Sequence, residues 1–317
     1  MTQSISELVL ENEKVRLTLL PEVGCKITKL EFLRHDFQWL WQDPYRPVKK
    51  PEFCASYAAY DISGFDECFP NIGLSKYPPD DQITLCDHGE VWAKPWKVVT
   101  AIDSVVASVD LTAMPITFRR KIQLDGERIH FNYDVTNTGN IACWYMWSAH
   151  PLFRLPNRYR VIAPLGQKMY KEFGLGGRLG DDGEDGYFNH LGELNWPEVI
   201  SQNGEVADLS QVIPDLGVTD KVVLEAKGIE DLMLINEDLS AGLSFKFSPE
   251  INHVGICSNL TAWPSGPHPA TWIAIEPMIG ISDRLDENIE LGAARKIDPN
   301  ESQSWNFSIT LLDLDIN

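Results

Sequence analysis

Residues 116–135 read ITFRRKIQLDGERIHFNYDV, and this stretch decides the fold class of the chain. In both halves apolar and polar residues alternate, so successive side chains face two different environments, as a strand with one buried face requires. Between the halves, Asp125-Gly126 is a turn sequence typical of a β-hairpin. The stretch therefore predicts two antiparallel strands joined by a tight turn.

The same features recur along the chain. Strand-like runs lie at 15–19, 243–247 and 305–311, and further turn sequences are Thr138-Gly139-Asn140, Ala241-Gly242 and Asp298-Pro299-Asn300. No long amphipathic helix is evident, and 20 prolines argue against a helical protein. No clear linker divides the chain. We expect an all-β protein, a large antiparallel β-sandwich or barrel-like pair of sheets, as one domain spanning residues 1–317.

The net charge of −19 limits the classes of partner. A nucleic-acid binder needs a basic face, and an anionic membrane surface would repel this chain, so neither partner is expected. A strongly charged phosphorylated substrate is disfavoured for the same reason. The simplest role of the charge itself is solubility.

The start of the chain lacks the basic and apolar regions of a secretory signal, and no run of about 18 apolar residues predicts a membrane span. The six cysteines are scattered without a C-x-x-C pair, which favours reduced thiols. These features together predict a cytoplasmic protein. The stretch 174–186, GLGGRLGDDGEDG, lacks a complete G-x-G-x-x-G and is acidic, so we expect an exposed loop rather than a phosphate cradle.

Four segments place polar residues among aromatic residues, glycines and prolines, a mixture that lines sugar sites. They are 87–96 with His88 and Trp96, 143–153 with His150, 272–280 with Glu276, and 218–224 with Asp220. Each has a structural alternative when taken alone. Either histidine could be a structural or neutral buried residue, Glu276 could meet water at a strand end, and Asp220 could begin a strand.

In this order, the segments resemble the aldose 1-epimerase, or galactose mutarotase-like, family over nearly the whole chain. His88-Gly89 and His150-Pro151 match its two histidine motifs, Ile275-Glu276-Pro277 matches its Glu-Pro motif, and 297–302 (IDPNES) resembles its last hairpin. The ordered set is more specific than any single motif. The resemblance implies a two-sheet supersandwich with a sugar cleft, although relatives of this fold include binding proteins and other carbohydrate enzymes.

The resemblance also implies roles for the matched residues. Glu276 would be the general base that takes the proton of the anomeric hydroxyl, and His150 the general acid that protonates the ring oxygen. His88 would hold the ring or C1 oxygen, Asp220 would bind ring hydroxyls, and Trp96 fits the aromatic residue that follows the first motif. Acid and base on opposite sides of the O1–C1–O5 unit require no metal or cofactor.

One departure from the family pattern concerns the segment before His88. Many members carry an Asn-Arg pair there, whose Arg binds sugar oxygens, but residues 64–73 read GFDECFPNIG and contain no Arg. Asp66 and Glu67 are expected to accept hydrogen bonds from sugar hydroxyls instead. Both would repel a phosphate.

The favoured function is an aldose 1-epimerase (mutarotase) that interconverts the α and β anomers of a free aldose. The alternatives are a non-catalytic carbohydrate-binding protein on the same fold, a hexose-6-phosphate mutarotase, and another carbohydrate enzyme. A glycosidase would need a second carboxylate beside Glu276, and the sequence offers no clear one. The expected partner is a small-molecule sugar, with its identity and the oligomeric state left open.

Overall fold

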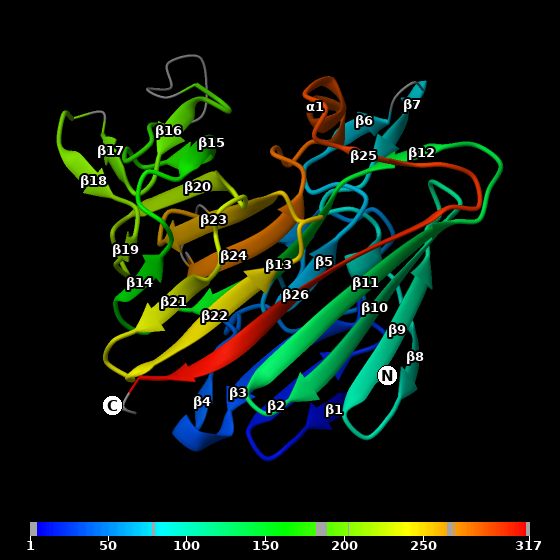
Figure 1. The fold of residues 1–317 in the computed structure, drawn as a ribbon, viewed down its shortest axis with the longest axis horizontal. Coiled ribbons are helices and arrows are strands. Elements are labelled where there is room, and N and C mark those ends of the chain that lie inside the picture. Colours follow the sequence, from blue (N-terminus) through cyan, green and yellow to red (C-terminus); the bar gives the residue numbers. More distant parts are fainter. Residues whose placement is uncertain are drawn as a thin grey trace.

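The computed structural model describes residues 5–77, 80–181, 189–201, 203–264, 268 and 270–314. Two large sheets lie against each other, and each is built from antiparallel strand pairs (Figure 1). Most of the buried hydrophobic residues of the two sheets belong to one core cluster. The expected all-β sandwich is confirmed.

The first sheet has eleven strands, ten of them in the order β1-β2-β3-β5-β13-β24-β23-β20-β15-β16, with β4 paired to β3. Their bounds are β1 Leu8–Glu11, β2 Val15–Leu20, β3 Lys26–Phe32, β4 Phe37–Gln38, β5 Phe65–Cys68, β13 Trp147–Arg154, β15 Lys168–Leu175, β16 Glu193–Asn195, β20 Val218–Glu225, β23 His253–Leu260 and β24 Thr271–Ile279.

The second sheet has nine strands in the order β19-β14-β21-β22-β26-β11-β10-β9-β8. Their bounds are β8 Lys97–Thr100, β9 Ser104–Asp110, β10 Ile116–Asp125, β11 Arg128–Asn137, β14 Tyr159–Ile162, β19 Gln211–Val212, β21 Leu232–Asn236, β22 Ala241–Phe247 and β26 Ser302–Asp313.

Short elements complete the described part of the chain. They are the two-stranded pairs β6 Ser75–Tyr77 with β7 Asp80–Leu85, β12 Cys143–Tyr145 with β25 Arg295–Ile297, and β17 Glu198–Ile200 with β18 Val206–Asp208, the helix α1 Leu285–Glu290, and 3-10 turns at Leu33–His35, Tyr57–Ala59 and Val91–Ala93. None of the described helices is long and apolar enough to cross a membrane.

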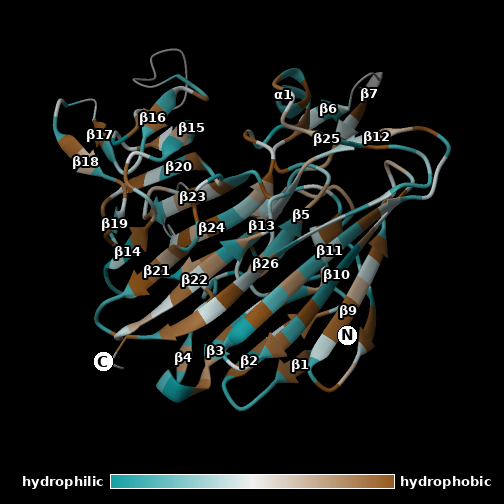
Figure 2. Cartoon of the chain, in the orientation of Figure 1, coloured by the Kyte–Doolittle hydropathy of each residue, from teal (hydrophilic) through white to brown (hydrophobic). Residues whose placement is uncertain are grey.

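The hairpin predicted at 116–135 forms as expected. In β10 and β11, buried and more exposed residues alternate, and Asp125 pairs with Arg128 across a two-residue turn. Gly126 adopts φ +57°, a conformation that glycine tolerates and that this tight hairpin turn requires. The alternation is visible as brown and teal bands along the strands (Figure 2). The inner side chains of the hairpin meet the first sheet, with the ring of Phe131 5.3 Å from that of Phe65.

Two local predictions need correction. Ala241-Gly242 was expected to be a turn but begins β22, and the turn precedes it at Ser240, whose φ is +50°. The expected exposed loop at 174–186 begins inside β15, and Leu179 is fully buried, while 182–186 lie outside the described residues. The turns at 138–140 and 298–300 are confirmed.

The cysteine prediction is wrong for one pair. Cys54 and Cys86, whose Cα atoms are 4.8 Å apart, form a disulfide, whereas Cys25, Cys68, Cys143 and Cys257 are free and buried. No local pattern indicates this pairing, because the two residues lie 32 positions apart and only the fold brings their segments together.

The central strands of the first sheet position the candidate site. β13, β20, β23 and β24 are buried at nearly every position, unlike the alternating strands of the second sheet. One face of these strands packs on the core between the sheets. Loops cover the other face, so polar side chains on that face are buried.

Candidate active site

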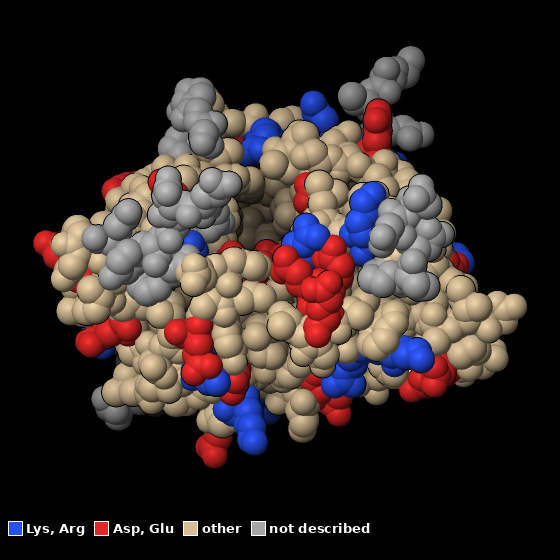
Figure 3. Space-filling model, turned by 90° about the horizontal axis from the view of Figure 1, so that it is seen from above, with Lys and Arg blue, Asp and Glu red and all other residues tan. Residues whose placement is uncertain are grey.

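A cavity of about 380 Å³ lies over the outer face of the central strands. Seen from above, the molecule is hollowed near the centre of this view, with acidic and basic side chains close by (Figure 3). The lining includes both predicted functional histidines, the predicted base and two tryptophans: His88, His150, Glu276, Trp263 and Trp272. A small concave site with apolar and convergent polar groups is the usual form of a small-molecule site.

His150 and Glu276 face each other from neighbouring strands. Ser148 of β13 pairs with Met278 of β24 and Leu152 with Ala274, which places His150 level with Glu276. The Nε2 of His150 is 3.8 Å from the Oε1 of Glu276, and both residues are buried. This pair therefore occupies the arrangement that acid–base chemistry on one small molecule requires.

The environment of His150 favours the neutral imidazole. Burial is the largest cause that lowers the pKa of His150 well below its usual value, and the neighbouring His88 and Lys221 lower it further. The charge of Asp283 raises the pKa of His150, but this effect is smaller than the combined lowering. In the sugar-free protein His150 is thus neutral at pH 7.

His88 is held beside this pair by a loop. Its Nδ1 is 2.8 Å from Asp87 Oδ1, its ring stacks on Tyr57 with centroids 3.9 Å apart, and it meets His150 edge-on at 5.3 Å. Burial alone would raise the pKa of Asp87, but the hydrogen bond and charge of His88 lower it overall. The next residue, Gly89, has φ +74°, and a Cβ there would lie 2.2 Å from the Phe69 carbonyl oxygen. Only glycine allows this close approach.

Lys221 is a site residue that the sequence did not reveal. Its Nζ lies 2.7 Å from Glu276 Oε2 and 2.7 Å from Asp283 Oδ1. Burial would lower the pKa of Lys221, but the carboxylates of Asp283 and Glu276 together raise it well above its usual value. The side chain is therefore an ammonium that supplies a counter-charge to the predicted base.

Asp220 faces away from this cavity. In β20, Thr219 and Lys221 line the cavity, and because successive strand residues point to opposite faces, Asp220 points elsewhere. Its Oδ2 accepts a hydrogen bond of 2.6 Å from Arg178 Nε. The expected contact between Asp220 and ring hydroxyls is therefore not supported by the geometry.

Asp66 and Glu67 are also not part of the cavity. Asp66 accepts a hydrogen bond from the Tyr57 hydroxyl and pairs with Lys26 at 3.1 Å, whereas Glu67 pairs with Arg120 at 2.8 Å inside the core. The geometry does not support their expected role as hydroxyl acceptors, because neither residue lines the cavity and each carboxylate is paired with an internal cation. Asp66 still supports the site indirectly, because it accepts the hydrogen bond of the Tyr57 hydroxyl and the Tyr57 ring stacks on His88.

Trp96 lies in the core rather than in the cavity. It is 6% exposed, its Nε1 donates to the carbonyl oxygen of Val91, and the Arg120 guanidinium lies 5.2 Å from its ring. The aromatic side chains that do line the cavity are Tyr57, Phe173, Trp263 and Trp272. Nothing in the spacing of these residues along the sequence indicates that they converge.

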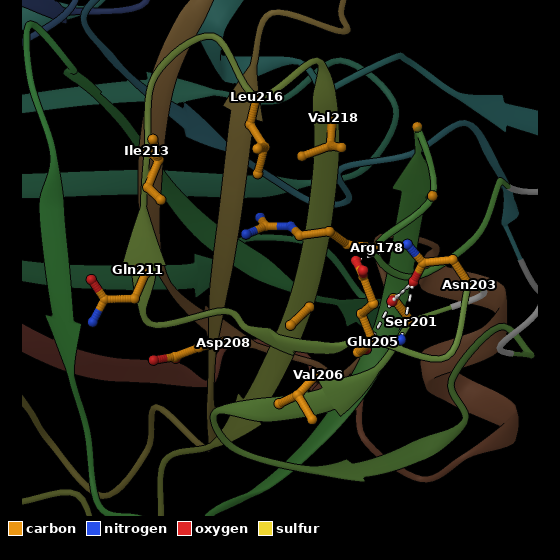
Figure 4. Close-up of a pocket in the computed structure, with 13 residues that line it drawn as sticks. Arg178, Ser201, Asn203, Glu205, Val206, Asp208, Gln211, Ile213, Leu216 and Val218 are labelled. Carbon is orange, nitrogen blue, oxygen red and sulfur yellow. Dashed lines mark hydrogen bonds between the residues drawn. The ribbon is translucent and has the colours of Figure 1, made fainter.

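A second, larger cavity of about 720 Å³ is lined by Arg178, Asp208, Gln211, Ile213, Leu216 and other residues (Figure 4). The guanidinium of Arg178 projects into it. Val218 of β20 belongs to this lining, so the strand separates the two cavities. The described lining residues include no histidine, whereas His150 and Glu276 both line the smaller cavity. Among the described residues, no group of three or more His, Cys, Asp or Glu side chains is arranged to hold a metal.

Solved structures with the same architecture cover almost the whole chain. The Slr1438 protein of Synechocystis sp. superposes with a TM-score of 0.70 at 16% identity, over 98% of this chain and 97% of that one. A galactose mutarotase related enzyme from Lactobacillus acidophilus gives 0.67 at 17%, over 98% and 99%. A GalM/aldose epimerase homologue from C. elegans gives 0.67 at 13%, over 98% and 100%.

No family model matches the sequence, and no curated protein matches it. The similarity therefore lies in the three-dimensional arrangement, at identities where the chemistry of a site is not transferred from one protein to another. The two-sheet architecture and the almost complete coverage agree with the resemblance seen in the motifs. The chain has the galactose mutarotase-like fold.

Proposed function

We propose that this protein is an aldose 1-epimerase that interconverts the α and β anomers of a free aldose. The observation that carries the proposal is the placement of His150 and Glu276, 3.8 Å apart, in one cavity that also holds His88. Ring opening of an aldose needs one group to remove the proton of O1 and another to protonate the ring oxygen O5. A buried imidazole and a carboxylate on adjacent strands meet that need.

The reaction is a balanced exchange of protons. Glu276 takes the proton from the C1 hydroxyl as the C1–O5 bond breaks, and His150 gives a proton to O5. The free aldehyde forms, the C1–C2 bond rotates, and closure on the other face of C1 returns both protons. Lys221 keeps a positive charge 2.7 Å from Glu276 and thereby favours the ionised base.

The remaining lining suits a neutral sugar. Trp263 and Trp272 offer apolar rings for the C–H faces of a pyranose, and His88 is held within reach of the C1 or ring oxygen. Among the described lining residues Lys221 is the only Lys or Arg, and it is already paired with two carboxylates. This composition favours a free aldose over a sugar phosphate, whose dianion would meet no uncommitted cation there.

A non-catalytic sugar-binding protein is the second candidate, and one observation favours it. The lowered pKa of His150 leaves little imidazolium at pH 7 to act as an acid. Binding without catalysis would retain the tryptophans and His88 but would not need the acid–base pair.

The two candidates separate in one experiment. The optical rotation of freshly dissolved α-D-glucose and α-D-galactose is followed with wild type and with Glu276→Gln, and sugar binding is measured in parallel by tryptophan fluorescence. Asp134→Asn, which changes an exposed carboxylate of β11, is the matched control. We expect wild type and the control to speed equilibration and Glu276→Gln to lose this effect while still binding sugar. Binding without any acceleration by wild type would exclude the epimerase and favour the binding protein.

A further inference from the structure

An irregularity in β15 places two consecutive side chains in the cavity. Lys171 pairs with Val222 of β20 and Phe173 pairs with Lys221, so Glu172 is an extra residue, a β-bulge. A regular strand would turn Glu172 and Phe173 to opposite faces, but both line the cavity. Bulges next to functional sites commonly redirect a side chain in this way.

The carboxyl of Glu172 is only half satisfied. Its Oε1 accepts a hydrogen bond of 3.1 Å from the backbone N–H of Asp283. Its Oε2 is buried and has no hydrogen-bond partner among the described residues, and His190 Nδ1 lies 4.0 Å away. A buried polar oxygen without a partner is unfavourable unless a ligand or water completes it, and this residue lines the cavity.

The charges around Glu172 decide its protonation. Asp283, Lys221 and His190 face it, and Glu287 lies beyond His190 with its Oε2 3.0 Å from His190 Nε2. Burial and then the charge of Asp283 raise the pKa of Glu172 to about 8, so the carboxyl is mostly protonated at pH 7. Oε1 already accepts the backbone N–H, so a proton held on Oε2 would make that oxygen a hydrogen-bond donor to a bound ligand.

The position of Glu172 relative to the proposed base indicates which part of a sugar it meets. Glu276 and Glu172 lie on β24 and β15, with β23 and β20 between them. Lys221 and Asp283 connect the two carboxyls through ion pairs and the backbone bond of Asp283. A pyranose whose C1 lies at Glu276 extends along this row toward β15. The ring carbon farthest from C1 is C4, and C3 is the adjacent ring carbon that also carries a hydroxyl.

We propose that Glu172 determines sugar specificity by donating a hydrogen bond from its Oε2 to the hydroxyl oxygen at C3 or C4 of the bound aldose. The inference rests on the proposed function, because that function places C1 at His150 and Glu276. Glucose and galactose differ only at C4, so this residue would influence the choice between them. Glu172 is a binding residue in this scheme and takes no part in the proton transfers.

The test is a thermodynamic cycle on sugar binding that combines a change at Glu172 with removal of one sugar hydroxyl. Wild type, Glu172→Ala and Glu172→Gln are titrated with D-glucose, 3-deoxy-D-glucose and 4-deoxy-D-glucose, with tryptophan fluorescence as the readout because Trp263 and Trp272 line the cavity. In wild type we expect one deoxy sugar to bind about tenfold more weakly than glucose or worse, the cost of leaving a buried donor unpaired. In Glu172→Ala that difference should disappear. Glu193→Ala, which alters an exposed residue of β16, is the control for surface effects.

The outcomes distinguish this inference from the proposed function. A deoxy penalty that persists unchanged in Glu172→Ala overturns the role of Glu172, and so does equal binding of all three sugars by wild type. Loss of the penalty in Glu172→Ala supports the role even if polarimetry shows no epimerase activity, in which case only the proposed reaction fails. Glu172→Gln retains a donor at this position and guards against a folding defect, so it should keep part of the discrimination.

Discussion

The ammonium of Lys221 reaches from β20 across β23 to lie 2.7 Å from Oε2 of Glu276 on β24. Both side chains are almost completely buried, and Asp283 completes the cluster on the other side of the ammonium. A carboxylate withdrawn from water stays ionised only when a counter-charge or donors stabilise it. The ammonium of Lys221 therefore stabilises the ionised form of Glu276, the proposed base.

Replacement of Lys221 by Met should impair catalysis more than sugar binding. Without the ammonium, Glu276 and Asp283 are left as two buried carboxylates, and the protonated form of Glu276 becomes more stable. We expect kcat to fall by at least about tenfold at pH 7 and the acid limb of the pH–rate profile to move to higher pH. Polarimetric kinetics between pH 5 and 8 measure both effects. Lys221→Arg should restore part of the rate, and an acid limb identical to that of wild type would refute the electrostatic role.

Gly255 should be sensitive to a single added methyl group. It pairs with Glu276 in the sheet, and a Cβ at this position would lie 3.2 Å from Glu276 Oε2 and 3.4 Å from Lys221 Cε. Gly255→Ala would push the ion pair aside by a few tenths of an ångström, and such misplacement of a catalytic group is costly. We expect a several-fold loss of kcat with an unchanged circular dichroism spectrum. Full activity in Gly255→Ala would show that the position of Glu276 is not critical.

The pH dependence of the rate tests the proposed proton donor. A histidine acts as an acid only in its protonated form, and burial holds the pKa of His150 well below its usual value. The protonated fraction therefore increases as the pH falls, so kcat/KM should rise by up to about tenfold per unit between pH 8 and 6. The spontaneous reaction must be subtracted at each pH. A rate independent of pH over this range would assign the donor role to a different group, and His88→Gln would then test His88.

The sequence predicted the fold well because the decisive features are local. Alternation in β10 and β11 and the Asp125-Gly126 turn specify a hairpin from adjacent residues alone. The same locality explains the misplaced turn at Ala241-Gly242, since a glycine inside a strand and a glycine in a turn look alike without knowledge of the register. Here the turn formed one residue earlier, at Ser240.

The candidate site was predictable only where a residue carried a local mark. His88 and His150 stand beside Gly89 and Pro151, and Glu276 precedes a proline. Lys221 and Glu172 bear no such mark, because their direction depends on strand register and on a bulge. The sequence could not show that Asp66 and Glu67 lie outside the cavity, because their partners, Lys26 and Arg120, are distant in the sequence and adjacent only after folding.

The buried pair of Arg120 and Glu67 should support stability and not sugar recognition. Both side chains are fully buried, and Arg120→Met leaves the Glu67 carboxylate without its cation, which typically costs about 3–5 kcal/mol. Arg119→Met, in the neighbouring position of β10, removes an exposed ion pair with Asp134 and should cost less than about 1 kcal/mol. Urea unfolding compares the two variants. Equal stability losses would contradict the assignment of the charged pair to the core.

The disulfide between Cys54 and Cys86 should hold the segment that carries Tyr57 against the segment that carries His88. Cys86 directly precedes Asp87-His88, and Cys54 lies three residues before Tyr57, whose ring stacks on His88. Reduction frees both segments, so we expect a higher KM with a smaller change in kcat, and a loss of stability of about 2–4 kcal/mol. Cys54→Ser should reproduce the reduced protein and should no longer respond to dithiothreitol.

Thiol titration in denaturant decides whether this bond exists in solution. Four free thiols without reductant and all six after reduction are expected, since the other four cysteines are free in the structure. Six free thiols in the protein as purified would mean that the Tyr57 and His88 segments are held by their noncovalent contacts alone. The KM would then be insensitive to dithiothreitol, and the hydrogen bond from the Tyr57 backbone N–H to Asp87 Oδ2 would couple the two segments.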